Sequence, residues 1–377
     1  MAMYSVLKCD SYSDVYDIVR DHFELHKICN EIPKDAHILI KPNLVTDKEA
    51  VFSVTTNPMF VFAIVKYLNE NGYKNITVAD CPGGALLMFS QMEDVYRKCG
   101  YDFLTEYVSL NKDFEGVDIL SPDNSVTKKF NVISILNEAD YIINVPKLKT
   151  HNTTGITCGV KNLFGCIPGL LKPQFHAKFP VTDDFCNMLV ELAQTVKPDF
   201  TIIDAIDIME GNGPTNGKKR HLGLTFAGKN VFGIDSFVAD FLSVPKCSVG
   251  TIVQSERKNL VPEEFDVCGD TDFLLKQPIL LPEYIRADSS YGKIRARINT
   301  VLAKIGSSVF MRYPQFNNNC TACGKCVLTC PQQALSCTGK KNVLDASKCI
   351  GCMCCDEVCP NNAIDIRKTI KVGESKK

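Results

Sequence analysis

The sequence predicts an α/β protein with two unequal parts: a layered domain with a largely parallel sheet, and a small C-terminal α+β domain. Strand-like runs alternate with helical patterns through the first two-thirds of the chain, which is typical of a layered α/β domain. Ten of the nineteen cysteines lie between Cys320 and Cys359. The length of 377 residues suits two or three domains of roughly 150 residues each.

The overall composition is that of a protein with a substantial hydrophobic core. Hydrophobic residues make up 45% of the chain and charged residues 23%. The formal net charge of −1 provides no broad basic field that would attract nucleic acid or an anionic membrane surface. The longest apolar runs are far shorter than the roughly 20 residues that a membrane-spanning helix needs. We therefore expect neither nucleic-acid binding nor a membrane span.

The N-terminal residues and the cysteine content indicate the compartment. The first residues contain neither the basic segment nor the apolar core of a signal peptide. Nineteen cysteines without an export signal argue against a disulfide framework and for a reducing environment. We therefore expect a cytoplasmic location.

Short β-rich runs and helical patterns build the expected α/β domain. Asn57 and Pro58 form a cap and first-turn pair for an amphipathic helix through Tyr67. A second helical stretch follows the Cys-Pro-Gly-Gly turn at 81–84 and continues to Lys98. The expected strands cover residues 37–43, 75–80, 141–146, 200–205 and 221–228.

A regular apolar stripe marks the expected boundary between the two domains. We expect a linker helix over residues 291–315, between an α/β domain at 1–290 and a C-terminal domain at 316–377. The linker is either a helix packed on the main domain, which the regular stripe favours, or a hinge to a mobile module. The stripe consists of apolar residues at helical spacing: Ile294, Ile298, Val301, Leu302, Ile305 and Val309.

The C-terminal cysteines form two copies of one pattern. Residues 320–331 read CTACGKCVLTCP and residues 349–360 read CIGCMCCDEVCP, so that both match C-x2-C-x2-C-x3-C-P at an offset of 29. This is the spacing of bacterial ferredoxins with two 4Fe–4S clusters, in which the fourth cysteine of each run binds the other cluster. CxxC pairs also bind zinc, but eight thiolates in this longer repeat favour iron and sulfur.

The spacing also predicts which cysteines share a cluster, and residues 316–367 as a whole resemble the two-cluster bacterial ferredoxins. We expect one cluster to be held by Cys320, Cys323, Cys326 and Cys359, and the other by Cys349, Cys352, Cys355 and Cys330.

The two cysteine runs differ after their second cysteine. Gly324 follows it in the first run, whereas Met353 and an extra cysteine, Cys354, follow it in the second. A bulkier or polar neighbour can shift the potential of a cluster, because hydrogen bonds and exposure tune that potential. We expect Cys337 and Cys354 to be spectators rather than ligands.

Residues 145–169, VPKLKTHNTTGITCGVKNLFGCIPG, combine three lysines, one histidine and four glycines in one segment of the α/β domain. We expect the strand at 141–146 to release here into a loop at the carboxyl edge of the sheet, where α/β proteins bind ligands. Glycines in this segment let backbone N–H groups approach a ligand. Its lysines suit a carboxylate or a phosphate, and its histidines can donate or accept protons near neutral pH. These residues are Lys147, Lys149, His151 and Lys161, followed by Lys172, His176 and Lys178.

Apolar residues interleave with these charges, which argues against the alternative of a purely solvated surface loop. We therefore expect an anion-binding site in this segment. Two other strand ends are expected to converge on it, with Lys41 and Asn43 after one strand and Gly83 and Gly84 after the next.

Residues 204–219 offer an acidic trio, Asp204, Asp207 and Glu210, followed by a glycine-rich turn. An aspartate after a strand is commonly a cap, and metal binding or acid–base chemistry is the alternative. The glycines of this turn match neither the P-loop nor the dinucleotide-binding spacing.

Five motifs in this order resemble the domain-of-unknown-function 362 family: KPN, D-x-P-G-G, PKLKTH, GVKN-x-x-G-x-x-PG and MEGNGP. The resemblance covers roughly residues 36–245 and adds Asn162, in GVKN, to the expected ligand-binding residues. It implies an α/β domain coupled to iron–sulfur clusters and a redox role, and it specifies no substrate.

The same central run is also similar to a stretch of the nickel-pincer lactate racemase family, through K-x-H, G-x-K and P-G. Too few positions match to transfer that cofactor. The similarity leaves Lys147, Lys149, His151 and Lys161 as candidate ligands of a cofactor instead of a substrate. Whether a flavin or a metal also binds stays open.

These observations favour a ferredoxin-linked oxidoreductase. Electrons from a redox partner protein would pass through both clusters to a small anionic substrate or cofactor in the α/β domain. Lys147, Lys149 and Lys161 would hold the anion, and His151 or His176 would supply protons.

The alternative is an electron-transfer or assembly protein that docks on a partner enzyme and carries out no chemistry in its α/β domain. The basic run at 218–221 would then be a docking patch. A third hypothesis is a cofactor-binding domain without redox chemistry, with clusters that regulate it.

Overall fold

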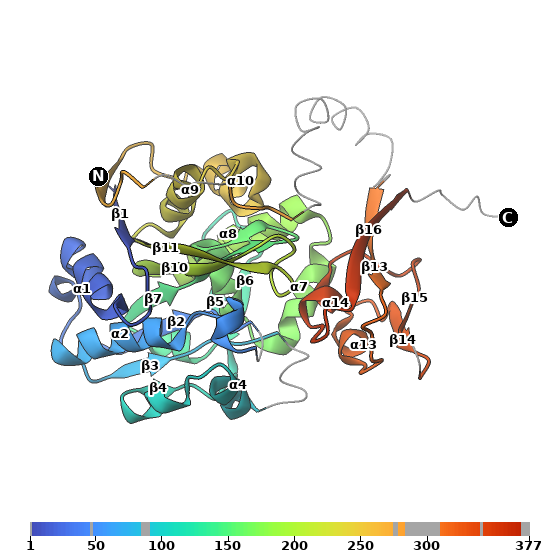
Figure 1. Ribbon diagram of the computed structural model, residues 1–377, viewed down its shortest axis with the longest axis horizontal. Coiled ribbons are helices and arrows are strands. Elements are labelled where there is room, and N and C mark those ends of the chain that lie inside the picture. Colours follow the sequence, from blue (N-terminus) through green and yellow to red (C-terminus); the bar gives the residue numbers. More distant parts are fainter. Residues whose placement is uncertain are drawn as a thin grey trace.

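The computed structural model describes residues 2–45, 48–83, 91–273, 278–282, 310–339 and 342–370. Figure 1 shows a large α/β domain with a smaller C-terminal module beside it. Gly84 and the apolar stripe at 294–309 lie outside the described residues. Residues 310–315, which were expected to end the linker helix, belong to a strand of the C-terminal module.

A mixed sheet of ten strands forms the centre of the α/β domain, in the order β12-β1-β11-β10-β7-β2-β3-β4, with β8 on β10 and β9 on β8. Its parallel part consists of β2 (Ile38–Pro42), β3 (Ile76–Val78), β4 (Ser109–Leu110), β7 (Tyr141–Val145) and β10 (Phe200–Glu210). Beyond β10 the sheet continues through β11 (Lys218–Gly228), β1 (Ala2–Lys8) and β12 (Phe265–Gly269), with β11 antiparallel to both of its neighbours. The predicted α/β class with a largely parallel sheet is therefore confirmed.

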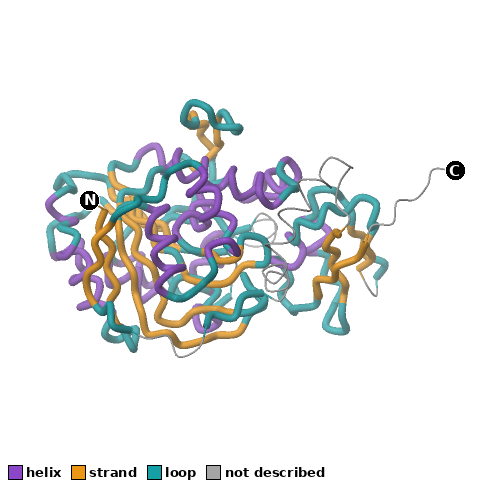
Figure 2. Tube along the Cα trace, turned by 90° about the horizontal axis from the view of Figure 1, so that it is seen from above, coloured by secondary structure: helices purple, strands orange, loops and turns teal. Residues whose placement is uncertain are grey.

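Helices cover both faces of this sheet, as Figure 2 shows. On β2, Ile38 and Ile40 pack into one apolar cluster and the intervening Leu39 into another, because successive side chains of a strand point to opposite faces. The first cluster includes residues of α1 (Val15–Leu25), α2 (Pro58–Glu70) and α4 (Met92–Lys98). The opposite face is covered by α8 (Thr182–Val196), α9 (Val231–Phe241) and α10 (Gly250–Arg257).

Helix α2 shows why these residues form a helix. The Asn57 side chain accepts a hydrogen bond from the backbone N–H of Met59, and Pro58 occupies the first turn, as predicted. Phe60, Ile64 and Leu68 follow at a spacing of four residues and are fully buried. Each of these side chains contributes roughly 1.5–3 kcal/mol of hydrophobic stabilisation.

The polar segment after β7 is not the loop that the sequence predicted. It forms the short strands β8 (Lys147–His151) and β9 (Gly155–Thr157), and both strands are buried along their whole length. β8 pairs with β10 and with β9. The prediction of a loop was wrong because β8 pairs with β10, and distant parts of the chain supply buried partners for the polar side chains of β8.

Shorter elements complete the α/β domain. The acidic trio lies within β10 rather than after a strand, since β10 continues to Glu210. The hairpin β5 (Gly116–Leu120) and β6 (Lys129–Ile133) forms a separate two-stranded sheet. The short helices are α5 (Ile135–Glu138), α6 (Gly159–Asn162) and α7 (Lys172–Lys178), with 3-10 turns at Ile28–Asn30, Ala50–Phe52, Asp102–Glu106, Leu163–Cys166, Gly169–Leu171 and Lys246–Ser248.

In the part that the structure describes, the C-terminal module is built from two antiparallel strand pairs and two short helices. The strand β13 (Phe310–Phe316) pairs with β16 (Ile364–Ile370), and β14 (Leu335–Cys337) pairs with β15 (Asn342–Leu344). The helices are α13 (Lys325–Thr329) and α14 (Cys354–Glu357). Its apolar core cluster has four buried members among the described residues: Cys326, Leu335, Cys355 and Ile364.

The longest helix in the described residues, α8, has 15 residues. Among the residues that the structure describes, none of the helices is both long enough and apolar enough to cross a bilayer.

Candidate functional site

A pocket lies where the α/β domain meets the C-terminal module. Its open volume of about 60 Å³ accommodates a few water molecules or a small anion. The α/β domain contributes Asn43, Val45, Asp80, Cys81, Gly83, Lys161, Asn162, Phe164, Gly165, Lys172, Pro173 and His176. The module contributes Thr329, Cys354, Glu357 and Val358.

The sheet places the pocket where α/β proteins commonly bind ligands. Asn43 follows β2 and Asp80 follows β3, so both side chains lie at the carboxyl ends of neighbouring parallel strands. The short helix α6, which carries Lys161, reaches the same edge of the sheet. The expectation that these separate segments converge agrees with this arrangement.

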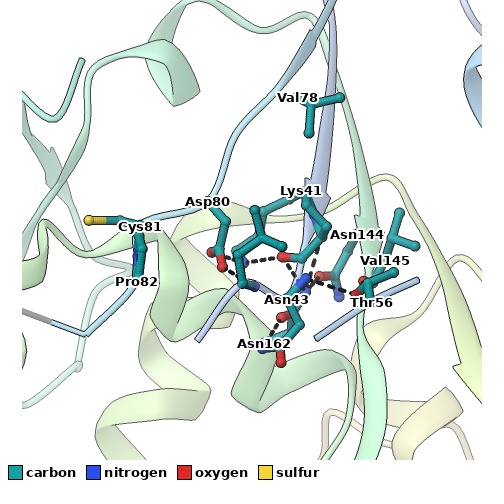
Figure 3. Close-up of polar contacts among 12 residues, drawn as sticks. Lys41, Asn43, Thr56, Val78, Asp80, Cys81, Pro82, Asn144, Val145 and Asn162 are labelled. Carbon is teal, nitrogen blue, oxygen red and sulfur yellow. Dashed lines mark hydrogen bonds and ion pairs between the residues drawn. The ribbon is translucent and has the colours of Figure 1, made fainter. Parts of the chain in front are cut away.

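Lys41 and Asp80 form a buried ion pair at the pocket (Figure 3), with Asp80 in the pocket wall and Lys41 behind it. The Lys41 Nζ atom lies 2.6 Å from Asp80 Oδ1, and the backbone N–H of Leu44 donates to Asp80 Oδ2 at 2.6 Å. Gly165 packs directly on the pair, because a Cβ atom at this position would lie 1.9 Å from the carboxylate. The charge of Lys41 is therefore neutralised within the protein.

A chain of buried amides connects the strand ends. Asn162 Nδ2 donates to Asn144 Oδ1 at 2.8 Å, and Asn43 Nδ2 donates to Asn162 Oδ1 at 2.9 Å, as Figure 3 shows. Asn43 Oδ1 in turn accepts a hydrogen bond of 2.7 Å from Lys149 Nζ. Such a network orients Asn43 and Asn162 for the pocket, because each amide group is held at both ends.

Lys149 is buried, and its described hydrogen-bond partners are uncharged. Its Nζ atom donates to Asn43 Oδ1 and to the Val54 carbonyl oxygen, and among the described residues no carboxylate forms an ion pair with it. Burial lowers the pKa of Lys149 well below its ordinary value, and the nearby Lys161 lowers it further. Lys149 therefore supports the pocket from one layer behind its wall.

Lys147 lies in a different part of the domain, paired with Asp204. Its Nζ atom is 2.9 Å from Asp204 Oδ1, and both side chains are fully buried. The Tyr12 hydroxyl accepts from Lys147 and donates to the same carboxylate, and the Asn57 N–H donates to Asp204 Oδ2. The pair is satisfied internally and does not line the pocket.

The other two acidic residues of β10 pair with the basic run of β11. Asp207 lies 2.8 Å from Lys219 Nζ and 2.9 Å from His221 Nδ1. Glu210 lies 3.0 Å from Arg220 Nη1. Two members of the acidic trio and three members of the basic run, which the sequence offered as separate candidate sites, thus pair with each other across two adjacent strands.

His176 reaches the pocket from α7. Its ring stacks on Phe185 with a centroid distance of 4.2 Å and meets the Phe164 ring edge-on at 5.9 Å. Burial lowers the pKa of His176 to about 4, so the ring is neutral near pH 7. A neutral imidazole offers one N–H donor and one acceptor nitrogen to a pocket ligand.

Two lysines bring positive charge to the pocket. Lys172 Nζ donates to the carbonyl oxygens of Cys81 and Pro82. Lys161 Nζ lies 5.1 Å from the centre of the Phe164 ring, and within the described ranges no carboxylate forms an ion pair with it. Desolvation lowers the pKa of Lys161, and the negative charge of Glu357 opposes this shift.

His151 does not line the pocket but holds Glu357 of the module. The backbone N–H of Thr153 donates to His151 Nδ1 at 3.0 Å, so the ring proton of the neutral form is on Nε2. Nε2 lies 3.2 Å from Glu357 Oε1 and donates to it. Burial lowers the pKa of His151 to about 4.

Glu357 is the only acidic side chain that the module contributes to the pocket wall in the described residues. Burial alone would raise its pKa, but the hydrogen bond from His151 and the positive charge of Lys161 outweigh it and lower the pKa to about 2. Glu357 is therefore ionised at neutral pH.

Asp356 makes a second polar contact between the domains. Its carboxylate accepts hydrogen bonds from Asn216 Nδ2 at 2.7 Å and Asn152 Nδ2 at 3.1 Å. Burial raises the pKa of Asp356 to about 7. Sequence reasoning missed Asp356 and Glu357, although the first cysteine run has Val327 and Leu328 at the matching positions and this contrast was a usable signal.

The eight motif cysteines line two separate cavities of the module. The first cysteine set (Cys320, Cys323, Cys326 and Cys359) lines one cavity. The second cysteine set (Cys330, Cys349, Cys352 and Cys355) lines the other. These groupings agree with the ligand sets expected from the spacing, including the exchange of the fourth cysteine.

The surroundings of these sulfur atoms fit 4Fe–4S clusters. All eight cysteines are free of disulfides. Backbone N–H groups donate to Cys330 Sγ at 3.2 Å and to Cys359 Sγ at 3.3 Å, and the Asn342 amide donates to Cys326 Sγ at 3.1 Å. Such donors stabilise the negative charge of ligand thiolates.

The predicted ligand-binding residues therefore fall into three groups. Asn43, Gly83, Lys161, Asn162 and His176 line the pocket together. Lys41 and Lys149 lie one layer behind it, and His151 holds Glu357 at its edge. Lys147 lies apart, in its pair with Asp204.

Known proteins resemble both parts of the chain. Residues 38–240 match the family described as a domain of unknown function, DUF362, and residues 315–336 and 343–365 each match the 4Fe-4S binding domain. The thylakoid-associated protein sll1697 of Synechocystis sp. is 34% identical over 238 residues, which are 62% of this chain and 71% of the relative.

Among solved structures, the lactate racemase apoprotein from Thermoanaerobacterium thermosaccharolyticum is similar at a TM-score of 0.42 and 16% identity. The match covers 63% of this chain and spans 57% of the racemase chain. This degree of similarity supports no conclusion about activity.

The family matches therefore account for both the motifs around the pocket and the two cysteine cavities. The chain belongs to the DUF362 family, and at its C-terminal end it carries two 4Fe-4S binding motifs that make it an iron–sulfur electron-transfer protein.

Proposed function

We propose that the protein is a ferredoxin-linked oxidoreductase that reduces or oxidises a small anion held in the pocket between its two domains. The pocket itself is the observation that supports this proposal. One wall carries Lys161, Lys172 and His176, and the other wall carries Cys354 and Glu357 of the cysteine-rich module. A ligand in this pocket lies beside the module that handles electrons.

The charges of the pocket indicate the class of ligand. Lys161 and Lys172 contribute two positive charges and Glu357 one negative charge. Lys41 and Asp80 cancel each other. The balance of one positive charge suits a monoanion, and in this partly desolvated space an unpaired ammonium is an effective partner for a carboxylate or another small oxyanion.

The histidines take different parts in this proposal. His176 faces the ligand and would donate or accept a proton there, because a substrate that gains electrons becomes more basic. His151 acts as a positioning residue, because both of its ring nitrogens are already bound, one by Thr153 and the other by Glu357.

The chemistry requires a redox partner. When bound, the two clusters supply one electron each, which is the number needed for a two-electron reduction. A two-electron reduction also consumes two protons, and a one-electron donor protein must return the two electrons. A cytoplasmic location belongs to the same proposal, because a reducing compartment keeps nineteen cysteines reduced.

The decisive experiment asks what the pocket binds. Native mass spectrometry of anaerobically purified protein would show any retained anion beyond the clusters. Calorimetry with acetate and with inorganic phosphate would measure weaker binding. We expect Lys161→Gln to lose at least tenfold in affinity and Lys178→Gln, an exposed lysine of α7, to leave it unchanged. Equal binding by both variants would refute the site.

The alternative function, a protein that passes electrons to a partner enzyme without a substrate of its own, gains support from one feature of the module. Leu328 on α13 is 52% exposed and Cys323 of the first cysteine set is exposed as well. A pull-down with the whole chain would favour this function if a protein partner is captured and no anion binds the pocket.

A further inference from the structure

The interdomain pocket shares a wall with only one of the two cysteine cavities in the described part of the chain. Cys354 lines both the pocket and the cavity of the second cysteine set. Cys354 also directly precedes Cys355, which belongs to that set. Val358 in the pocket wall precedes Cys359 of the first set, yet no residue lining the first cavity lines the pocket.

The two cavities also differ in their exposure to solvent. Thr321, Cys323 and Asn361 line the first cavity and are exposed. Among the described residues that line the second cavity, none is exposed. The first cavity therefore borders solvent through exposed residues, whereas the second is lined by buried and partly buried residues and borders the pocket.

The internal repeat allows the linings of the two cavities to be compared position by position. Lys325 occupies the position of Cys354 in the first run, 29 residues earlier. Lys325 lines the first cavity just as Cys354 lines the second. At the same point of the repeat, the first cavity thus has a cation and the second has a neutral thiol that faces the pocket.

We propose that the second cysteine set holds the cluster that senses the pocket ligand, and that Cys354 is the positioning residue that separates the two. The first set then holds the cluster that exchanges electrons with the redox partner. This inference rests on the proposed anion site and adds to it which cluster of the module is affected by the bound anion.

The physical consequence is a coupling between anion binding and one reduction potential. A negative charge in a pocket of low dielectric disfavours the addition of an electron to the nearer cluster more than to the farther one. The anion must therefore bind more tightly when that cluster is oxidised. A tenfold preference for the oxidised state corresponds to a shift of about 59 mV for a one-electron couple.

The test uses the full chain with both clusters and measures potentials by electron paramagnetic resonance, with and without acetate. Ionic strength is matched with the bulky sulfonate buffer HEPES. Lys325→Gln identifies the signal of the first set, because removal of a cation from the first cavity lowers only that potential. We expect acetate to lower the other potential and Lys161→Gln to abolish this shift.

Calorimetry on the same samples separates the possible failures. If acetate binds and moves the potential that Lys325→Gln also moves, or moves neither, the inference is overturned while the anion site stands. If acetate and phosphate both fail to bind, the proposed function fails and the coupling fails with it. Cys354→Ser provides a check without a ligand, since it is expected to move only the potential that Lys325→Gln leaves unchanged.

Discussion

The α/β domain and the cysteine-rich module are stabilised in different ways. In the described residues, the α/β domain has three extensive apolar clusters on the two faces of its sheet, and two of its buried lysines form internal ion pairs, Lys41–Asp80 and Lys147–Asp204. Within the described residues, the apolar core cluster of the module has four buried members, two of them motif cysteines. A core of this size does not stabilise a fold without metal or another partner.

The difference explains why the candidate site lies between the two parts. Within the α/β domain, Lys41 and Lys147 already have carboxylate partners, whereas Lys161 at the pocket has none in the described residues. The module supplies Glu357, together with the cysteine cavities, from the other side. Neither part alone contains all groups of the pocket.

Removal of iron would affect the two parts most unequally. We expect chelation under reducing conditions to unfold residues 316–367 and to leave the α/β domain folded, because ligation supplies most of the free energy that holds the module together. Limited proteolysis with mass spectrometry would show rapid cleavage confined to the module. Protection of the module without iron would contradict this comparison.

Lys147→Met would sharpen the comparison between paired and unpaired lysines. The substitution leaves Asp204 buried without its partner, and we expect it to lower the free energy of unfolding by about 3–5 kcal/mol. Lys161→Met serves as the control and is expected to change stability by less than about 1 kcal/mol, since it breaks no ion pair. Urea unfolding followed by circular dichroism measures both. Similar losses in the two variants would show that the pairing is not the cause.

Glu357→Ala tests the contact between the parts. The substitution removes a hydrogen bond between His151 and an ionised carboxylate, and we expect the docked state to lose about 1.5–3 kcal/mol. Hydrogen exchange of the Thr153 and Thr154 amides, which donate to His151, should then accelerate. Leu328→Ala, at the matching position of the first run, should leave these rates unchanged. Accelerated exchange in both variants would argue against a specific contact.

The buried histidines of the α/β domain predict sensitivity to acid. His22 and His26 both hydrogen-bond Ser5, and His22 also bonds Thr225. Burial lowers the pKa of His22 to about 3 and that of His26 to about 4, the latter with a contribution from Lys229 that Glu31 opposes. The folded-state pKa of each of these histidines is below its unfolded-state value. The stability that the two neutral rings contribute is therefore fully present above about pH 6.5, and it is lost as the pH falls towards 4.

We expect the titration of His22 to lower the free energy of unfolding by about 2 kcal/mol at pH 5 relative to neutral pH. His22→Gln should flatten the dependence of the free energy of unfolding on pH between 6.5 and 5, even though it destabilises the protein at pH 7. Urea unfolding at several pH values measures this slope. An unchanged slope in the variant would mean that another group is responsible.

Local patterns predicted much of the fold. The cap at Asn57, the strand at 38–42 and the alternation of strands with helices depend on neighbouring residues, and the structure shows all three. The role of the segment at 147–157 could not be predicted in the same way. Its lysines give no local sign of their partners, because Asp204 and Asn43, which bind Lys147 and Lys149, are far away in sequence.

The sequence by itself determined the class of the protein and its electron-carrying groups, because cysteine spacing and strand periodicity are local properties of the chain. Tertiary structure decided which polar residues meet. Asp356 lies 204 residues from Asn152, and the pocket combines Lys161 with Cys354 and Glu357 across the two domains. Long-range packing decides which charges are neutralised internally and which remain for a ligand, and no local pattern encodes that choice.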